Sequence, residues 1–292
     1  MNTPLGMLEI DRILGGGPAA PALSDRIVLG MPHLCPGGLS ETWLLRECGH
    51  RHWFLLAQAA GRAVPEFRDA EGDPIYAAFV GVSVRDAQFD EAREHDELAF
   101  DSRLWRVSRT RFVSIHRLWL RGRPVGDVFM TSVFVKRMES GLNRSIARVE
   151  VPRLPPIEVA PKFATHAEMV TTLRSGQWKE HLGFTRADAA VLPRLIVDPC
   201  PAQDFNGADL LYFASFQTFV DRAEWEFLRP LNPRATTRRR DIVYHGNVEV
   251  GERVAVVLRA ARREPAAIGH WCLIERESDA EPLADIFTLR KV

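Results

Sequence analysis

Residues 204–225 read DFNGADLLYFASFQTFVDRAEW, and the fold class follows from this stretch. Apolar side chains recur in it and just beyond it at every third or fourth position, the spacing of one buried helix face: Phe213, Phe216, Val220, Ala223 and Phe227. Asn206 is placed to cap such a helix, and Asp209, three residues later, can return the bond as in a capping box. We therefore predict a buried helix over Asn206–Phe227.

The first half of the chain contains a matching segment. Residues 26–45, RIVLGMPHLCPGGLSETWLL, can be laid on residues 194–213, RLIVDPCPAQDFNGADLLYF, as a short strand, a Pro/Cys turn, a Gly-containing loop and the start of an apolar helix. Ser40 is the N-cap candidate and Gly61 the stop signal. Four residues of this helix share one face: Leu44, Cys48, Leu55 and Ala59. We predict a second buried helix over Ser40–Gly61.

Each predicted helix is followed by runs that alternate between apolar and polar residues, as half-buried strands do. The runs are PIYAAFVGVSV, SRLWRVSRTRFVSIHRLWL and PVGDVFMTSVFVKRM in the first half, and RRRDIVYHGNVEV, RVAVVLRAARR, AIGHWCLIER and PLADIFTLRKV in the second. One long helix per half cannot build a parallel βαβ sheet, so we predict an α+β protein whose helices are wrapped by curved antiparallel sheet.

The same pattern predicts the domain organisation. We expect a flexible arm over residues 1–24, one unit over residues 25–152 and a second over residues 194–292. Residues 153–193 form the predicted linker and connecting segment, because Val149–Phe163 carries four prolines.

Composition narrows the classes of function and partner. The chain has 292 residues with 38 basic and 38 acidic side chains, so net charge gives no reason to expect nucleic acid or a membrane as a partner. No apolar run approaches the length of a membrane span, and the N-terminus lacks the basic head of a signal peptide. The four cysteines lie far apart without a C-x-x-C pair. We predict a cytoplasmic protein with reduced thiols and no metal site.

Several strings together resemble the leinamycin-type acyltransferase/decarboxylase family of polyketide biosynthesis. They are PHLCPGGLSETWLL…GHRHW, DPIYAAF, DFNGADLLYFASFQTFVDRAEW and DIVYHGN, and the resemblance runs roughly from Arg26 to Leu289. It implies a tandem double hot dog fold and an enzyme that decarboxylates methylmalonyl-coenzyme A, or malonyl-coenzyme A, and transfers the acyl group to an acyl carrier protein. It implies no bound cofactor, since coenzyme A comes with the substrate. Association of two chains is a further expectation.

The resemblance places the family's acyl-accepting tyrosine at Tyr76, in the string IYAAF. A phenol with a pKa near 10 is a weak nucleophile at neutral pH, so it needs a neighbouring cation or donor, or else acts as a hydrogen-bond donor itself. An aromatic residue that opens a strand also packs well without any catalytic role. Cys35 is the rival nucleophile or a substrate contact, because it precedes a helix N-terminus, where the pKa of a thiol falls.

Gly37 and Gly38 come just before the first helix and raise a choice between packing and catalysis. Their amides could bind the thioester oxygen as negative charge grows on it when carbon dioxide leaves. The alternative is that the two glycines make a tight turn.

The second half offers candidates of two kinds. Asp204 and Asn206 precede the second helix and are predicted to meet the thioester, although capping explains Asn206 as well. Five further residues are candidates for substrate binding: His245 and Asn247 at a strand end, and Arg238, Arg239 and Arg240 as a basic tract for phosphates or an acidic carrier. The alternatives are a chain turn for the first two and a charged strand edge for the arginines.

Two other functions stay open at this stage. A hot dog thioesterase or dehydratase would use a carboxylate such as Asp204 or Glu41 as its base. A catalytically silent acyl-binding module would bind the thioester without reaction.

Overall fold

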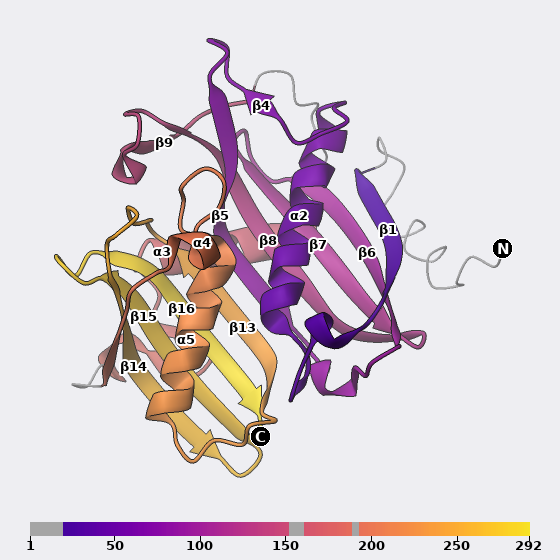
Figure 1. The fold of residues 1–292 in the computed structure, drawn as a ribbon, viewed down its shortest axis with the longest axis vertical. Coiled ribbons are helices and arrows are strands. Elements are labelled where there is room, and N and C mark those ends of the chain that lie inside the picture. Colours follow the sequence, from indigo (N-terminus) through magenta and orange to yellow (C-terminus); the bar gives the residue numbers. More distant parts are fainter. Residues whose placement is uncertain (1–19, 152–160, 189–192) are drawn as a thin grey trace.

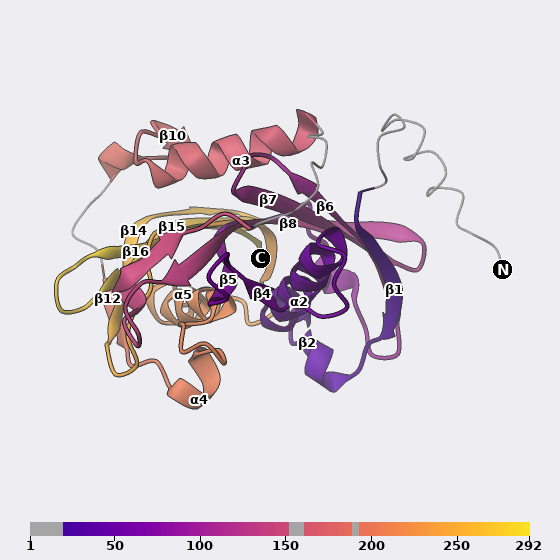
Figure 2. The same ribbon diagram turned by 90° about the horizontal axis from the view of Figure 1, so that it is seen from above.

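The computed structural model describes residues 20–151, 161–188 and 193–292. The expected arm and the Pro-rich linker lie mostly outside these ranges. Within them, twelve strands form one antiparallel sheet, with two long helices on one face and a third helix on the other (Figure 1 and Figure 2). The predicted α+β class is confirmed.

The two halves contribute the same main elements in the same order. The first half has β1 (Ala22–Val28), α2 (Glu41–Ala59), β5 (Pro74–Arg85), β6 (Glu97–Arg106), β7 (Arg111–Leu120) and β8 (Arg123–Arg137). The second has β12 (Arg194–Val197), α5 (Phe213–Phe227), β13 (Thr236–Tyr244), β14 (Val254–Glu264), β15 (Ala267–Arg276) and β16 (Pro282–Lys291). The sheet order β1-β6-β7-β8-β5-β13-β16-β15-β14-β12 mirrors one half on the other, with β5 and β13 at the centre.

Short elements connect these main ones. They are β2 (Leu34–Cys35), β3 (Gly38–Leu39), β4 (Phe67–Arg68), β9 (Ile146–Arg148), β10 (Glu180–His181), β11 (Phe184–Thr185) and α4 (Pro201–Asp204). Of these, β4 and β9 extend the large sheet beside β5 and β8.

Helix α2 forms as predicted. The hydroxyl of Ser40 accepts a hydrogen bond from the Trp43 N–H at 3.3 Å and so caps the first turn. Gly61 takes a φ of +66°, and the next N–H, of Arg62, donates to the Ala57 carbonyl at 2.8 Å, which is how a glycine in the left-handed region ends a helix. The four residues predicted to share one face are all buried.

Helix α5 begins later than predicted, at Phe213 instead of Asn206. The side-chain oxygen of Asn206 accepts hydrogen bonds from the N–H groups of Ala208 and Leu210, which closes a local turn. Asp209 then takes a φ of +56°, which no helix continues through. The predicted capping box is therefore wrong. The predicted apolar face is buried from Phe213 to Ala223, and Phe227 at the end of the helix is partly buried.

Part of the predicted connecting segment is the helix α3 (Pro161–Arg174), which covers the sheet face opposite α2 and α5 (Figure 2). Val170 of α3 lies against Gly81 of β5, where a Cβ atom would overlap the valine methyl groups. Val170 also packs with Val80 and Val133 of the sheet. The segment is thus part of the folded core as well as a connection.

The centre of the sheet holds a buried ion cluster on the face of α2 and α5. Arg240 of β13 is fully buried, and its guanidinium lies 2.9 Å from a carboxylate oxygen of Glu41 on α2 and 2.7 Å from one of Asp221 on α5. Arg290 of β16 also contacts Asp221, at 2.6 Å. One cation of a central strand therefore binds both long helices.

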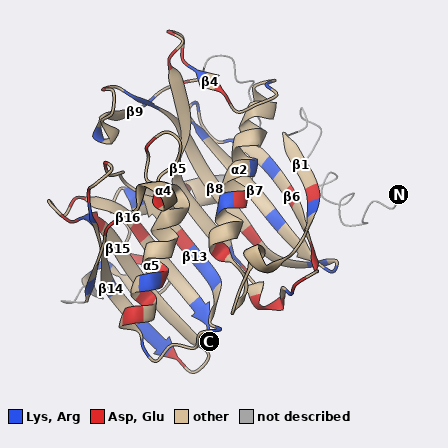
Figure 3. Cartoon of the chain, viewed as in Figure 1, with Lys and Arg blue, Asp and Glu red and all other residues tan. Residues whose placement is uncertain are grey.

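The opposite face of β13 carries a second cluster. Asp241 is fully buried and accepts hydrogen bonds from Ser83 at 2.5 Å, His181 at 2.9 Å and Arg239 at 3.2 Å. Figure 3 shows basic residues and an adjacent acidic residue on the central strand β13. Burial alone would raise the pKa of Asp241, but its partners outweigh burial and lower that pKa to about 2.

We predict that Arg240→Met lowers the free energy of unfolding by about 3–5 kcal/mol, because it leaves the buried carboxyl group of Glu41 without its cation, whereas Asp221 keeps Arg290. Denaturant titration at pH 7 measures this loss. The control is Arg253→Met, whose ion pair with Glu277 is largely exposed and should contribute about 1 kcal/mol or less. Equal effects of the two substitutions would contradict the role given to Arg240.

The lowered pKa of Asp241 predicts a pH dependence of stability. A depressed carboxyl pKa stabilises the folded state above the unfolded pKa of 3.8, and this stabilisation is lost as pH falls toward about 2. It amounts to about 2 kcal/mol at neutral pH. Asp241→Asn should therefore be less stable than the parent at pH 7, with the difference shrinking between pH 4 and pH 2. A difference that stays constant over this interval would refute the assignment.

Candidate functional site

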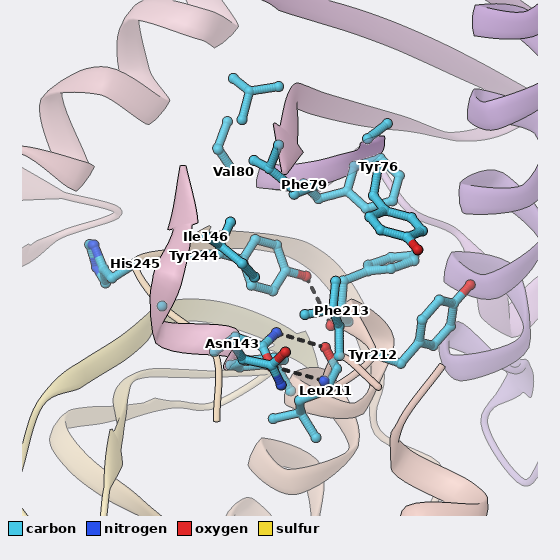
Figure 4. A pocket seen from close by; sticks show the side chains of 18 of the residues that line it. Tyr76, Phe79, Val80, Asn143, Ile146, Leu211, Tyr212, Phe213, Tyr244 and His245 are labelled. Atoms are coloured by element: carbon cyan, nitrogen blue, oxygen red, sulfur yellow. Dashed lines mark hydrogen bonds between the residues drawn. The ribbon is translucent and has the colours of Figure 1, made fainter. Parts of the chain in front are cut away.

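The two halves of the sheet separate at one end of their junction. β5 and β13 pair only from Gly81 to Val84 on the β5 side. The pairing of β5 with β8 continues beyond Gly81, with a β-bulge at Phe79–Gly81. β13 ends at Tyr244, and the chain turns away after it. A cavity of about 500 Å³ lies where the strands diverge (Figure 4).

The cavity is lined by residues from both faces of the sheet. Phe213, Phe216 and Tyr244 belong to the core beneath the two long helices, whereas Val80 and Val133 pack toward α3. A second cavity of about 290 Å³ adjoins it beside α2. The two cavities share six lining residues: Trp53, Tyr76, Phe79, Asn206, Tyr212 and Phe213.

Tyr76 lies at the junction of the two cavities. It is half-buried near the start of β5, and its hydroxyl has no hydrogen-bond partner among the described residues. Figure 4 shows the hydroxyls of Tyr76 and Tyr212 on the same side of the cavity. Burial raises the pKa of Tyr212, with Arg46 opposing the shift, so Tyr212 stays a protonated donor at neutral pH.

Asn206 adds a third donor. Its side-chain oxygen is engaged in the turn before α5, which leaves its amide N–H₂ without a partner in the described part of the chain. Since Asn206 lines both cavities beside Tyr76, the turn that displaced the start of α5 also presents this amide to the cavity.

Two further polar residues of the lining are structural. The Tyr244 hydroxyl donates to the Phe213 carbonyl at 3.0 Å, and burial raises its pKa well above the ordinary value. Asn247 uses both ends of its amide on the backbone of Leu211, at 2.9 and 3.1 Å. These bonds tie the end of β13 to the start of α5 and thereby shape the cavity wall.

His245 lines the larger cavity at the end away from Tyr76 (Figure 4). Its Nε2 atom lies 2.9 Å from the Asp285 carboxylate, whose other oxygen accepts a hydrogen bond from the Trp271 indole at 2.7 Å. A carboxylate in this position fixes the ring orientation and leaves Nδ1 available, the arrangement of an oriented general base.

The structure thus brings four of the predicted site residues to one cavity, Tyr76, Asn206, His245 and Asn247. Asp204 is not among the lining residues, since its carboxylate accepts a hydrogen bond from the Cys200 N–H at 2.9 Å and closes the short helix α4. Glu41, the other predicted base, is bound in the ion cluster around Arg240.

Cys35, Gly37 and Gly38 lie around a different surface cavity, beside Arg234 and Lys291. The neighbours of the glycines give them a role in packing. A Cβ atom on Gly38 would overlap the Phe89 carbonyl, and one on Gly37 would lie 3.3 Å from the Ala235 carbonyl. The two glycines therefore allow close packing of backbone on backbone, and the structure does not bring them together with Tyr76.

The basic tract Arg238–Arg240 is a correction to the sequence prediction. β13 is an interior strand between β5 and β16, so the tract is not a strand edge. Arg240 is buried in the ion cluster and Arg239 binds Asp241, so neither is free to receive a phosphate. Only Arg238 of the three is exposed.

Sequence reasoning missed Tyr212 and the partner of His245, Asp285. One signal was present: the chain has three tyrosines, and all three line this cavity. Asp285 gave no comparable signal, because its contact with His245 spans 40 residues and depends on the pairing of β13 with β16.

Comparison with solved structures identifies proteins of the same fold. An acyl-ACP thioesterase from Bacteroides thetaiotaomicron superposes with a TM-score of 0.63 at 8% identity, covering 93% of this chain and 98% of its own. The 12:0-ACP thioesterase of Umbellularia californica gives 0.60 at 8% identity over 92% and 94%. A protein of Lactobacillus plantarum described as "oleoyl thioesterase (putative)" gives 0.61 at 12% identity over 94% and 97%. At these identities the likeness concerns the fold alone.

No protein-family model matches the sequence, and no curated protein matches it by sequence. Within the described residues, no helix is long and apolar enough to cross a membrane. The same residues contain no group of His, Cys, Asp and Glu side chains that could hold a metal ion.

Gly49 of α2 tests the packing that shapes the cavity. A Cβ atom there would lie 2.7 Å from two ring carbons of Phe213, which is itself packed against Phe79 and Tyr212. Helix propensity alone would make Gly49→Ala stabilising by about 0.5–1 kcal/mol. We predict instead a loss of about 1–3 kcal/mol from overpacking, measured by denaturant unfolding, with the exposed Gln58→Ala as control. A stabilised Gly49→Ala protein would contradict the close packing.

Proposed function

We propose that the protein is a tandem double hot dog enzyme that decarboxylates methylmalonyl-coenzyme A, or malonyl-coenzyme A, and transfers the acyl group to an acyl carrier protein. The proposal joins the sequence resemblance to the geometry around Tyr76. The names of the solved structures of like fold, which are acyl-ACP thioesterases, support acyl thioesters as the substrate class.

One observation carries the choice of reaction. The cavity beside α2 offers hydroxyl and amide donors from Tyr76, Tyr212 and Asn206, and its described lining includes the exposed His50 but no Asp, Glu, Lys or Arg. In the larger cavity the sole carboxylate of the described lining is the exposed Glu281. Hydrolysis needs a base that activates water, and in the described lining only the histidines His50 and His245 could serve, since no buried carboxylate is available. Decarboxylation needs only an uncharged site that disfavours the localised carboxylate and donors that stabilise the enolate.

The first step breaks the bond between the carboxylate and the α-carbon. Its electron pair becomes the enolate of the thioester, carbon dioxide leaves, and a proton from water restores the C–H bond. Tyr76 and Asn206 donate hydrogen bonds to the thioester oxygen as the charge develops on it.

The second step moves the acyl group. The Tyr76 oxygen bonds to the thioester carbon, the C–S bond breaks, and the phenolic proton passes to the departing sulfur of coenzyme A. The thiol of the carrier then attacks the tyrosyl ester and returns its proton to Tyr76. The departing sulfur takes the phenolic proton, so the step balances, and Tyr212 and Asn206 are the donors on the same cavity that would favour the phenolate.

Tyr76→Phe tests both steps, since it removes one oxygen and keeps the ring. We predict that decarboxylation falls by about 10²–10³-fold, as for the loss of one oxyanion donor, and that transfer to the carrier is abolished. Carbon dioxide release and the mass of the carrier measure the two activities separately. Tyr244→Phe is the control, because that hydroxyl is bound to the Phe213 carbonyl. Transfer at the parent rate by the Tyr76→Phe variant would remove Tyr76 from the mechanism.

A thioesterase is the second candidate, and the His245–Asp285 pair favours it. In this function His245 takes a proton from water, which attacks the thioester carbon, and the product is free acid. His245→Gln should abolish release of free acid if this function holds. It should leave decarboxylation by the Tyr76 site intact if the first proposal holds.

A further inference from the structure

The outer end of the larger cavity carries two arginines that no acid neutralises among the described residues. Arg148 is the last residue of β9 and Arg174 the last of α3, and both line the cavity. Arg148 is exposed and has no hydrogen bond or ion pair in the described ranges. Arg174 makes one hydrogen bond, to the His245 carbonyl at 3.4 Å.

Two other arginines on the same rim differ from this pair. Arg144 forms an ion pair with Glu252, and Arg276 lies 2.7 Å from Asp279 and 3.5 Å from Glu252. Their charges are therefore balanced within the chain. Arg144 and Arg276 are thus neutralised, whereas Arg148 and Arg174 are not neutralised by any described residue.

Arg148 and Arg174 lie close enough for their positive charges to repel each other. Burial, followed by the positive charges of Arg148 and Arg111, lowers the pKa of Arg174. Arg111 is in turn fixed by a 2.6 Å hydrogen bond to Thr171 of α3. Like charges placed together without a counter-charge favour binding of an anion, and guanidinium groups match phosphate oxygens in geometry.

We propose that Arg148 and Arg174 bind the phosphate that adjoins the pantetheine arm of the acyl thioester, so that the substrate enters from the α3 face. The arm then runs through the gap between β5 and β13, and the thioester reaches Tyr76. This inference rests on the proposed function for the identity of the thioester. Coenzyme A and the phosphopantetheine of a carrier protein share the phosphate that is bound.

The polarity along the cavity fits this orientation. Its outer end is cationic, whereas the part beside α2 has no Asp, Glu, Lys or Arg in the described lining. A phosphorylated arm with an acyl group at its other end therefore fits in one direction. The site also takes the place of the tract Arg238–Arg240, in which Arg239 and Arg240 are bound within the fold.

The test compares binding of 4′-phosphopantetheine with that of pantetheine, which lacks only the phosphate. In the parent protein we expect the phosphate to tighten binding by about 10- to 100-fold, the range for charge-assisted hydrogen bonds. Arg148→Gln with Arg174→Gln should remove this difference and leave pantetheine binding unchanged. The matched control is Arg144→Gln, on the same rim but paired with Glu252, which should keep the difference. An unchanged preference for phosphopantetheine in the double variant would overturn the proposal.

The single variant Arg148→Gln guards against misfolding, because the exposed Arg148 side chain makes no hydrogen bond or ion pair with the described residues. We expect it to weaken phosphopantetheine binding by about 10-fold. Steady-state assays separate the two sources of the phosphate. A raised KM of the Arg148→Gln variant for the coenzyme A substrate, for the carrier protein or for both supports the site and shows which of the two binds there. Unchanged KM values for both overturn the proposal. Binding needs no turnover, so a protein that prefers phosphopantetheine but releases no carbon dioxide would refute the proposed function and retain this site.

Discussion

The buried guanidinium of Arg240 fixes how the two halves of this protein meet. It extends from a central strand and contacts Glu41 of α2 and Asp221 of α5, so both helices must lie over the same point of the sheet. A buried charge without partners costs several kcal/mol, which makes this arrangement strongly preferred. The junction of β5 and β13 is secured there over only four residue pairs. Beyond them the strands are free to diverge, and the divergence makes the cavity.

The local sequence pattern was enough to predict the elements that depend on nearby residues or on the spacing of apolar residues. The cap at Ser40, the stop at Gly61 and the apolar faces of both helices follow from spacing alone, and so does the repetition of one helix before several strands. The start of α5 did not follow. Asn206 has the same preference for capping a helix and for closing a turn, and the turn is decided by Asp209 in the left-handed region.

The candidate site was predictable only where a single residue carried the signal. Tyr76 and Asn206 came from their strings, and the structure places them beside one another on the cavity. The glycines before α2 and the arginines of β13 also stood out in the sequence, and the structure gives the glycines backbone neighbours and two of the arginines ion-pair partners. Each depends on a long-range neighbour, the Phe89 carbonyl for Gly38 and Glu41 for Arg240, which spacing along the chain does not reveal.

The position of the cavity also explains how a fold of this kind can take different reactions. The walls come from strand ends and from the turn before α5, where a substitution alters chemistry with little cost to the sheet. His245 lies at the end of the cavity away from Tyr76, so an oriented histidine and a group of neutral donors line different parts of one cavity. Under the proposed function, the end that holds the thioester carbon would decide between hydrolysis and decarboxylation. The phosphate anchor proposed at Arg148 and Arg174 would set that position, because it would fix how far along the gap the arm extends.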